Sequence, residues 1–590
     1  MAPHTSTSMK ASTSVAPVRS ARSSSRATSA PLAAVVLGSA VLDGVLALPI
    51  RRPRIFGDEL IYWLLGRALG WSGTFTLRGD TGQRYGFVYP VLLAAVQRVG
   101  SDQKTAYAVA QGLNALLFSL AAVPAYAISR RVLSKQAALA AAALSVVLPS
   151  CIYTSNIFTE NAFYPIFVTS ALLMLRALER PTLARQLLVI GACVIAFLTR
   201  AQAVVLLPSY LLAALVMAVV ANAGRRRVAL ADSLRRHAPT TAALALGGIV
   251  ALALRGRLTL GPYHVLVTSY GVRPLGHWAL ANVADMEIYL GVVPVAAFLV
   301  LLSSRFISVE LRRLTVLTAC LACGLLATVA ALSASPYGLG RVHERNVFYL
   351  APLVLISFLA WLEAGLPRPR WITPVVAILV VALPLTIPRP AVSVSGEDAI
   401  ATILWAQLPL SPGAMIIGMV LVAAVAAVVF LWARSWKAPV ALCLAALVSG
   451  IVLGERHAIE SLHTGSSQWR DEGWIDRAVG SDANVVALWA TTQRGSQTVR
   501  IGGLWADEFF NRSVRDVASA DGGLGDGIPV ETMTIGPGRC LRIAIPSRPR
   551  YAVLETRRPL AVPVVTVSPS GRSVLYRLEP KDACFAHFAR

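Results

Sequence analysis

The sequence predicts a polytopic α-helical membrane protein that carries a small α/β or β-rich domain at the end of its chain. Hydrophobic residues make up 56% of the 590 residues and charged residues only 14%, whereas soluble domains carry about 25% charged residues. Apolar runs of about 20 residues, the length that crosses a bilayer, recur along most of the chain. They are absent beyond residue 454. We therefore expect a membrane region at 31–454 and a separate domain at 455–590.

The N-terminal segment, residues 1–30, is rich in Ser, Thr, Ala and Pro. We expect a disordered cytoplasmic tail, because this composition is too polar to build a core. The first apolar run, 31–50, lacks a clear small-residue cleavage site and many runs follow it, so an uncleaved span is favoured over a signal peptide. Asp43 lies well inside this span. An acid within the membrane is a candidate for function, and hydrogen bonding within the helix bundle is the alternative.

Further apolar runs bring the expected number of spans to about thirteen. They lie near 106–129, 136–153, 160–177, 184–200, 201–221, 238–255, 286–302, 314–332, 346–363, 371–388, 412–433 and 438–454.

The charges between these runs predict the orientation of the chain. With the N-terminus inside, the cytoplasmic loops are "SRRVLSK", "RALERPTLAR", "NAGRRRVALADSLRRH", "SRFISVELRR", "EAGLPRPR" and "ARSWKAP". All of them are basic, as the positive-inside rule requires. This orientation places outside the segments 51–105, 256–285, 333–345 and 455–590, with shorter turns at 154–159, 199–201 and 389–411. We therefore expect a multi-pass protein of the plasma membrane with an extracytoplasmic C-terminal domain.

The net charge of +24 does not require a nucleic-acid partner. Lys and Arg concentrate in the short stretches between apolar runs, where they control topology. We expect membrane lipids, and no nucleic acid, among the partners.

The segment 455–590 contains four strand-like pieces, "NVVALWA", "CLRIAI", "YAVLETR" and "SVLYRL", separated by Gly, Pro and Ser clusters. Cys540 and Cys584 fall in this segment, and a disulfide between them is possible outside the cytoplasm; the sequence leaves the pairing open. Cys320 and Cys323 have zinc-knuckle spacing without a second pair, and the favoured interpretation is small, buried apolar residues.

The first expected outer loop begins with "RRPRIFGDELIYWLLGRALG" and places Asp58 and Glu59 directly after the first span. Apolar residues recur at helical spacing from residue 60 to residue 69, which predicts an amphipathic helix ending at Gly70. We expect this helix to lie along the membrane surface, with Tyr62 and Trp63 at the level of the lipid headgroups.

Two interpretations of the carboxylate pair remain open on local grounds. Asp58 is a candidate N-cap, and Glu59 in the first turn favours the helix dipole. The other interpretation is catalysis on the outer face.

Two further outer turns carry candidate residues. The stretch "IFTENAFYPIF" puts Glu160 at the start of a span, where it is either a helix-start carboxylate or a catalytic group. The stretch "AFLTRAQAVVLLP" puts Arg200 and Gln202 in a turn between two spans. A cation there needs a partner, which an anionic ligand headgroup would supply; the alternative is a snorkelling arginine.

The stretch "SPYGLGRVHERNVFYLAP" gathers Arg341, His343, Glu344 and Arg345 directly before another span. Guanidinium groups make bidentate, charge-assisted bonds to phosphate oxygens. The pattern therefore favours a phosphate site, and binding of anionic lipid headgroups in general is the alternative.

These outer-face motifs resemble the GT-C membrane glycosyltransferases, in particular the branch with protein O-mannosyltransferases and the aminoarabinose transferases of lipid A. The matching pieces are "GDELIYWLLGRAL", "RYGFVYPVLLAAV", "TENAFYP", "FLTRAQAVVLLP" and "RNVFYLAPLVLI". Together they cover residues 31 to about 365, and no matching motif lies beyond 454. The resemblance implies a GT-C-like catalytic domain that uses a polyprenyl-phosphate sugar on the outer face.

The resemblance also assigns catalytic roles. Family members carry an acidic residue in the first outer loop that acts as a general base on the acceptor hydroxyl. That role falls on Asp58, with Glu59 beside it, and Glu160 matches the acidic residue that opens a mid-chain span.

Substrate-binding roles follow in the same way. Arg200 matches the basic residue of the family's TK/TR turn and would hold the donor phosphate. Gln202 follows it, in an Ala-Gln pair where relatives often show Gly-Pro. Arg341, His343 and Arg345 occupy a loop that in the family often faces the lipid phosphate. Tyr89, in the second matching piece, completes the expected substrate-binding residues.

We therefore expect an inverting glycosyltransferase, a hexosyl- or pentosyltransferase, that moves sugar from a polyprenyl-phosphate donor to a glycan, lipid or protein acceptor. One base near the acceptor and cations on the leaving phosphate suffice for this chemistry. We expect no cofactor; a divalent cation held by Asp58, Glu59 and Glu160 is conceivable but not favoured. The alternatives are a transporter or flippase, which would need a polar pathway or broken helices, and a non-catalytic assembly protein that binds envelope polysaccharide.

Overall fold

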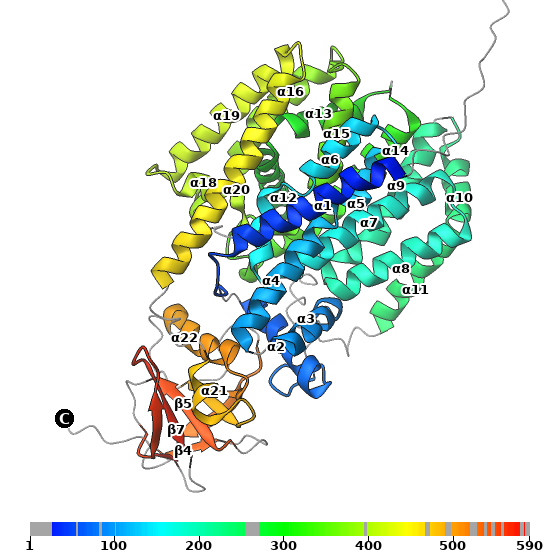
Figure 1. The fold of residues 1–590 in the computed structure, drawn as a ribbon. Helices are drawn as coiled ribbons and strands as arrows, with labels where there is room; N and C mark the ends of the chain where they lie inside the picture. Colours follow the sequence, from blue (N-terminus) through cyan, green and yellow to red (C-terminus); the bar gives the residue numbers. More distant parts are fainter. Residues whose placement is uncertain are drawn as a thin grey trace, which may run out of the picture.

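The computed structural model describes residues 26–584, and the parts of this range outside the description are residues 55–56, 82–84, 101, 223, 254–270, 306, 395–397, 466–472, 490–496, 520–527, 536–539, 544–548, 556–559 and 579–582. A large bundle of helices occupies most of the chain, and a small domain with a β-sheet lies at one end of it (Figure 1). The expected disordered tail falls largely outside the described residues. Helix α1 begins at Arg26, five residues before the expected first span.

The bundle consists of long helices joined by short loops and single 3₁₀ turns. Its helices are α1 (Arg26–Ala47), α2 (Gly57–Ser72), α3 (Val88–Val99), α4 (Gln103–Ser119), α5 (Ala122–Ser129), α6 (Lys135–Leu144), α7 (Glu160–Glu179), α8 (Leu183–Thr199), α9 (Leu206–Ala221), α10 (Arg226–Arg236), α11 (Ala238–Ala253), α12 (Val272–Leu290), α13 (Val293–Ser303), α14 (Val309–Ala334), α15 (Ala351–Glu363), α16 (Ile372–Ala382), α17 (Arg389–Val394), α18 (Ile400–Ala406), α19 (Pro412–Trp432) and α20 (Lys437–Gly465). The 3₁₀ turns are η1 (Pro149–Ser155), η2 (Ala201–Val205), η4 (Pro336–Gly338), η5 (Glu344–Asn346), η6 (Phe348–Leu350) and η7 (Leu383–Thr386).

Each expected span coincides with a helix or a pair of consecutive helices. Within the described residues, seven helices are long and apolar enough to cross a membrane, or up to nine if each of two bent pairs counts as one span. Shorter apolar helices, among them α8, α11 and α16, account for the other expected spans. The polytopic helical architecture is confirmed, and the count of about thirteen spans stays a prediction.

Two expected spans are wrong as continuous helices: 136–153 bends by 52° between α6 and η1, and 286–302 bends more sharply. The chain turns through 116° between α12 and α13. Gly291 and Val292 both adopt positive φ, 84° and 66°, a region that L-residues rarely occupy. A Cβ on Gly291 would lie 3.1 Å from the carbonyl oxygen of Leu442 in α20. Hydropathy depends on the side chains and carries no information about the direction of the backbone, so the apolar run did not predict this turn.

The expected cytoplasmic loops meet at one end of the bundle. Arg131, after α5, pairs with Glu179 at the end of α7. The hydroxyl of Ser134 donates to the carboxylate of Glu363, at the end of α15. Loops that alternate along the sequence thus lie side by side, which is the arrangement that alternating spans require. Which side of the membrane this end faces stays a prediction.

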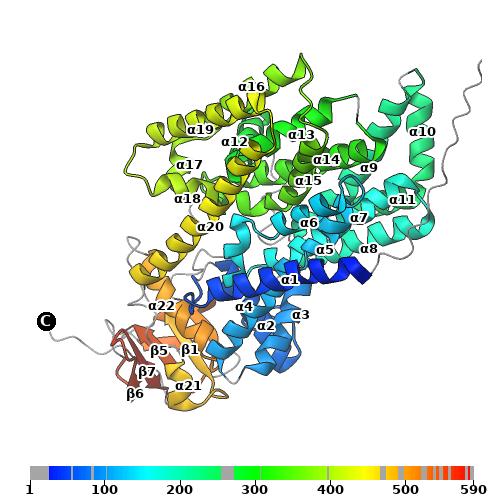
Figure 2. The same ribbon diagram turned by 45° about the horizontal axis from the view of Figure 1, so that its top comes forward.

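The C-terminal domain is a mixed α/β structure (Figure 2). Its strands are β1 (Val485–Trp489), β2 (Val514–Ser519), β3 (Glu531–Ile535), β4 (Cys540–Ile543), β5 (Tyr551–Glu555), β6 (Val564–Val567), β7 (Ser573–Arg577) and β8 (Ala583–Cys584), in the sheet order β6-β7-β5-β1-β2-β3-β4-β8. The strands from β5 to β3 run parallel and the outer pairs run antiparallel. Helices α21 (Trp474–Val479) and α22 (Gln497–Phe510) accompany it. All four expected strand pieces are strands.

The expected cysteine features have different outcomes. The backbone register of β4 and β8 places Cys540 opposite Cys584. Their side chains lie outside the described part of the structure, so the disulfide stays a prediction. Cys320 is buried as expected, but Cys323 is exposed, so the expectation that both are buried is wrong for Cys323. Residues three apart differ by about 60° in direction around a helix, and Cys323 points to the exposed side of α14.

A hydrophobic cluster connects the two parts of the molecule. It contains Trp63 from α2, Leu93 from α3 and Tyr107 from α4, together with Phe509 from α22. Helix α22 lies beside α2 and α4 in both views (Figure 1, Figure 2). The C-terminal domain is therefore packed against the helices of the first outer loop.

Candidate active site

Helix α2 carries both carboxylates of the first loop in its first turn, and they point to different environments. The Asp58 side chain is 49% exposed, and its Oδ2 lies 2.8 Å from Nη2 of Arg345. Glu59 is fully buried. Its carboxylate accepts hydrogen bonds from the backbone N–H groups of Arg54 (3.1 Å) and Ile157 (2.9 Å), and from Nδ2 of Asn156 (3.2 Å). Asp58 can thus meet a substrate, whereas Glu59 ties the loop before α2 to the loop before α7.

The expected exposure of Tyr62 and Trp63 to the lipid headgroups is wrong. The residues of α2 from Glu59 to Gly66 are buried without interruption, and the helix continues past Gly70 to Ser72. The rings of Tyr62 and Trp63 are enclosed by protein instead of standing at headgroup level. The apolar pattern correctly predicted a helix, but its covering surface comes from α3 and α22.

Glu160 begins α7 and joins two arginines. Its side chain is 2% exposed, with Oε2 2.8 Å from Nη1 of Arg200 and Oε1 3.0 Å from Nε of Arg345. A buried carboxylate is tolerated where cations pair with it. Glu160 thereby fixes the spacing of the two guanidinium groups.

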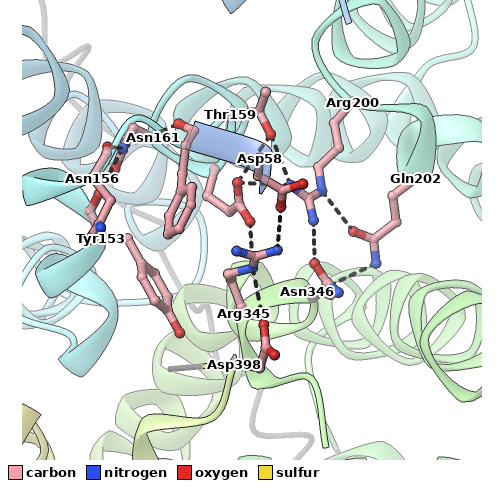
Figure 3. A network of polar contacts seen from close by, with 12 residues as sticks. Asp58, Tyr153, Asn156, Thr159, Asn161, Arg200, Gln202, Arg345, Asn346 and Asp398 are labelled. Carbon is pink, nitrogen blue, oxygen red and sulfur yellow. Dashed lines mark hydrogen bonds and ion pairs between the residues drawn. The ribbon is translucent and has the colours of Figure 1, made fainter. Parts of the chain in front are cut away.

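Arg200 lies at the break between α8 and η2, where its backbone is extended. Its guanidinium donates to Thr159 Oγ1 (2.9 Å), to Asn346 Oδ1 and to Gln202 Oε1 (3.3 Å). The amide of Gln202 in turn donates to the backbone carbonyl of Asn346 at 2.8 Å. The turn between α8 and α9 is thus joined to the loop before α15 through side chains (Figure 3).

Arg345 in η5 is the centre of the network. Besides Asp58 and Glu160, its Nε lies 3.7 Å from Oδ1 of Asp398, and its guanidinium stands over the ring of Phe158 at 4.7 Å. Burial alone would lower the pKa of Arg345, but Glu160, Asp58 and Asp398 together raise it well above the ordinary value. Arg345 is therefore a permanent cation held between three carboxylates.

Arg341 belongs to the edge of this network. Its Nη1 pairs with Oδ2 of Asp398 at 3.2 Å, and its side chain is about one-third exposed. Asp398 precedes α18 and connects Arg341 to Arg345. Arg341 is placed where an incoming anion could reach it.

His343 and Glu344 are turned away from this network. The backbone N–H of His343 donates to Asn282 Oδ1 at 2.8 Å, and its ring is buried. Burial lowers the pKa of the His343 imidazole, and Asp398 opposes this only in part. The ring is therefore neutral near pH 7 and adds no positive charge. Glu344 accepts from the backbone N–H of Ala401 at 2.8 Å.

Tyr89 is likewise buried, in α3. Its hydroxyl donates to Asn114 Oδ1 at 2.9 Å, and its ring packs edge-on against Tyr62. Asn114 also donates to the backbone carbonyl of Asn156 at 2.8 Å. Tyr89 thus supports the loop before α7 through Asn114, and it does not lie on the exposed side of the arginine network.

The structure therefore brings together Asp58, Glu160, Arg200, Gln202 and Arg345, with Arg341 at the edge. It places Glu59, His343 and Tyr89 in supporting positions. Sequence reasoning missed Thr159, Asn346 and Asp398. Asp398 stands in an expected outer turn beside another acid, Glu397, in "SGEDAI". This second pair of adjacent acids in an outer turn, similar to Asp58–Glu59, is the sequence feature that could have identified Asp398 as a site residue.

The network can bind an anion and accept a proton. Three arginines face three carboxylates, and the most exposed carboxylate is Asp58. Charge-assisted guanidinium groups suit phosphate oxygens. Among the residues that the structure describes, no group of three or more His, Cys, Asp or Glu side chains is arranged to hold a metal ion. Glu59 faces Asn156 rather than converging with Asp58 and Glu160.

Comparisons with known proteins agree with this architecture. Residues 85–252 match the family model of the dolichyl-phosphate-mannose-protein mannosyltransferases. No curated protein matches the chain. ArnT from Cupriavidus metallidurans, solved bound to undecaprenyl phosphate, has a similar fold: the TM-score is 0.50 at 12% identity, with 93% of this chain and 98% of that chain covered.

Two other solved structures are less similar. The arabinosyltransferase EmbB from Mycobacterium smegmatis has a TM-score of 0.42 at 13% identity, over 80% of this chain and 45% of that chain. The oligosaccharyltransferase of Archaeoglobus fulgidus has a TM-score of 0.41 at 13% identity, over 88% and 69%. The family-model match and the fold shared with ArnT confirm that this chain resembles the GT-C membrane glycosyltransferases.

Proposed function

We propose that the protein is an inverting glycosyltransferase of the plasma membrane that moves a sugar from a polyprenyl-phosphate donor to an acceptor hydroxyl on the outer face. The observation that carries the proposal is the pairing of Arg200 and Arg345 through the buried Glu160, with the half-exposed Asp58 on the same guanidinium. Cations for a leaving phosphate and a base for an acceptor thus stand side by side. The acceptor is a glycan, a lipid or a protein.

The proposed reaction is a direct displacement. The acceptor oxygen attacks the anomeric carbon on the face opposite the phosphate, and its proton passes to the Asp58 carboxylate. The bond between the anomeric carbon and the phosphate oxygen breaks, and its electron pair stays on the lipid phosphate. Arg345 and Arg200 stabilise that charge. Glu160 is buried and doubly paired, so we assign it the positioning of the two arginines rather than the proton transfer.

An apolar cavity supports a lipid donor. It has a volume of about 280 Å³ and is lined by residues that include Pro149, Tyr289, Ala401 and Trp405. The backbone N–H of Ala401 donates to Glu344, the neighbour of Arg345 in sequence. We propose that the prenyl chain of the donor occupies this cavity. Undecaprenyl phosphate, the lipid bound in the ArnT structure, is the natural probe.

Replacement of the proposed base tests the function. In liposomes that contain polyprenyl-phosphate sugars, Asp58→Asn should lower the transfer rate by about 10²–10⁴-fold, the usual contribution of a general base. Asp102→Asn is the matched control, because Asp102 caps α4 through its bond to the N–H of Thr105 and Asn caps equally well. Transfer at the wild-type rate in Asp58→Asn would overturn the proposal.

One observation favours a second candidate, the movement of a lipid across the membrane. The 116° break between α12 and α13 is the kind of broken helix that transporters use. Flipping of a fluorescent polyprenyl phosphate in liposomes, at equal rates in wild type and Asp58→Asn, would support transport instead of transfer.

A further inference from the structure

We propose that the C-terminal domain positions the catalytic helix: α22 holds α2 in the orientation that places Asp58 beside Arg345, with Arg67, Arg78 and Glu508 as the positioning residues. The inference rests on the proposed role of Asp58. It goes further by giving the C-terminal domain a part in the reaction and by naming the contacts that transmit it.

Trp63, one turn after Glu59, makes the first contact. Its indole Nε1–H donates to the backbone carbonyl of Phe509 at 3.2 Å. The two rings are stacked with their centroids 4.8 Å apart and their planes 6° from parallel. An indole that is both stacked and hydrogen-bonded permits little rotation of the helix that carries it.

Arg67 makes the second contact, on the same face of α2 because it follows Trp63 by four residues. Its guanidinium donates to three backbone carbonyls at and beyond the end of α22: Glu508 at 2.8 Å, Asn511 at 3.1 Å and Val514 at 3.1 Å. The last carbonyls of a helix lack partners within the helix and carry partial negative charge. Arg67, from another part of the chain, thus donates the hydrogen bonds that the carbonyls at the C-terminal end of α22 lack within the helix.

Arg78 makes the third contact, from the turn after α2. Its Nε donates to Glu508 Oε1 at 2.7 Å, its Nη2 pairs with Oε2, and its Nη1 donates to the carbonyl of Pro529 at 2.8 Å. The side chains of Arg78 and Glu508 are 3% and 0% exposed. The backbone of Arg78 has φ of 49°, which a non-glycine residue adopts only when its surroundings hold it there.

These contacts do more than attach the C-terminal domain to the bundle, because they also affect the position of Asp58. Asp58 precedes Arg67 by nine residues, which is roughly 13 Å along a helix. A tilt of a few degrees at Arg67 would therefore move Asp58 by about 1 Å, enough to lower a reaction rate strongly. Glu59 fixes one end of α2 through Ile157 and Asn156. Arg67 and Arg78 fix the other end.

The inference predicts a separation of kinetic effects. The arginines that would hold the donor phosphate belong to the helix bundle, where Arg200 donates to Asn346 and Arg345 pairs with Glu160. Loosening α22 should therefore lower kcat while leaving the affinity for undecaprenyl phosphate unchanged. A general loss of folding would lower both.

The test uses the full-length protein with Glu508→Gln, which removes the charge of the buried pair. We expect kcat to fall by about tenfold or more, hydrogen exchange of the α2 amides to accelerate, and undecaprenyl phosphate affinity to stay within about twofold of wild type. Glu460→Gln is the control, because Glu460 forms an exposed pair with Arg456 on α20. Arg78→Met combined with Glu508→Leu should recover part of the loss, because no buried charge is left without its partner.

If Glu508→Gln does not fold, Trp63→Phe gives the same test, since it removes the indole N–H and keeps the stacking. Wild-type kcat in either variant, with Asp58→Asn inactive, would overturn this inference alone. Unchanged exchange of the α2 amides would also overturn it. Activity of Asp58→Asn would instead overturn the proposed function, so the two failures are distinct.

Discussion

Neighbouring acidic residues in this protein have opposite environments. Asp58 is half exposed beside Arg345, and Glu59 is buried under three hydrogen-bond donors. The sequence singled out the dipeptide but could not divide the roles, because two of the three donors to Glu59, Asn156 and Ile157, lie almost one hundred residues away. The same holds for Glu160, whose two arginines come from loops far along the chain.

Asp398 gives a residue-scale prediction. Its carboxylate pairs with Arg341 and Arg345, to which a donor phosphate would also bind. The three arginines of the network are already paired with three carboxylates. Phosphate must therefore compete with Asp398. Asp398→Asn should tighten undecaprenyl phosphate binding by roughly 3–10-fold, because a neutral amide competes less well for guanidinium. Calorimetric titration of the purified variant checks this; weaker binding than wild type would show that Asp398 assists the phosphate.

At the scale of elements, hydropathy predicted where helices lie but not how they bend or what covers them. Apolar runs mark the helices because only an apolar surface suits a bilayer. The turn at Gly291 depends on two backbone conformations, and the burial of α2 depends on α3 and α22. Four strands were predicted from the sequence and β2, β3, β6 and β8 were not, although β6 consists entirely of β-branched residues.

Gly86 gives a prediction at this scale. It lies before α3 and packs against the end of α8, where a Cβ would stand 2.7 Å from the carbonyl carbon of Thr199, the residue before Arg200. Gly86→Ala should therefore destabilise the fold by about 1–3 kcal/mol, and it should displace Arg200. Thermal unfolding in detergent and transfer assays measure both effects.

Gly112→Ala is the control for that substitution. A Cβ on Gly112 meets nothing within 4 Å, and the residue lies inside α4, so alanine should be neutral or slightly stabilising. Equal unfolding temperatures for the Gly86→Ala and Gly112→Ala proteins would contradict the close packing of Gly86.

At the scale of the whole molecule, the segments that the charge pattern placed on the outer face do meet. The first loop, the turn after α8 and the loop before α15 meet in one network (Figure 3). The C-terminal domain contacts the first loop through Arg67. Positive charges between apolar runs predicted this grouping because they fix which loops share a side. The docking of α22 on α2 was beyond prediction, because it joins residues more than four hundred positions apart.

In the proposed mechanism, cations hold the lipid phosphate and a carboxylate acts on the acceptor. The affinity of the purified protein for undecaprenyl phosphate tests this division most directly. Arg345→Lys should weaken binding by about tenfold, since lysine keeps the charge but loses the planar, bidentate donor geometry. Asp58→Asn should bind undecaprenyl phosphate as tightly as wild type or more tightly. Wild-type affinity in Arg345→Lys, or an equal loss in Asp58→Asn, would contradict this mechanism.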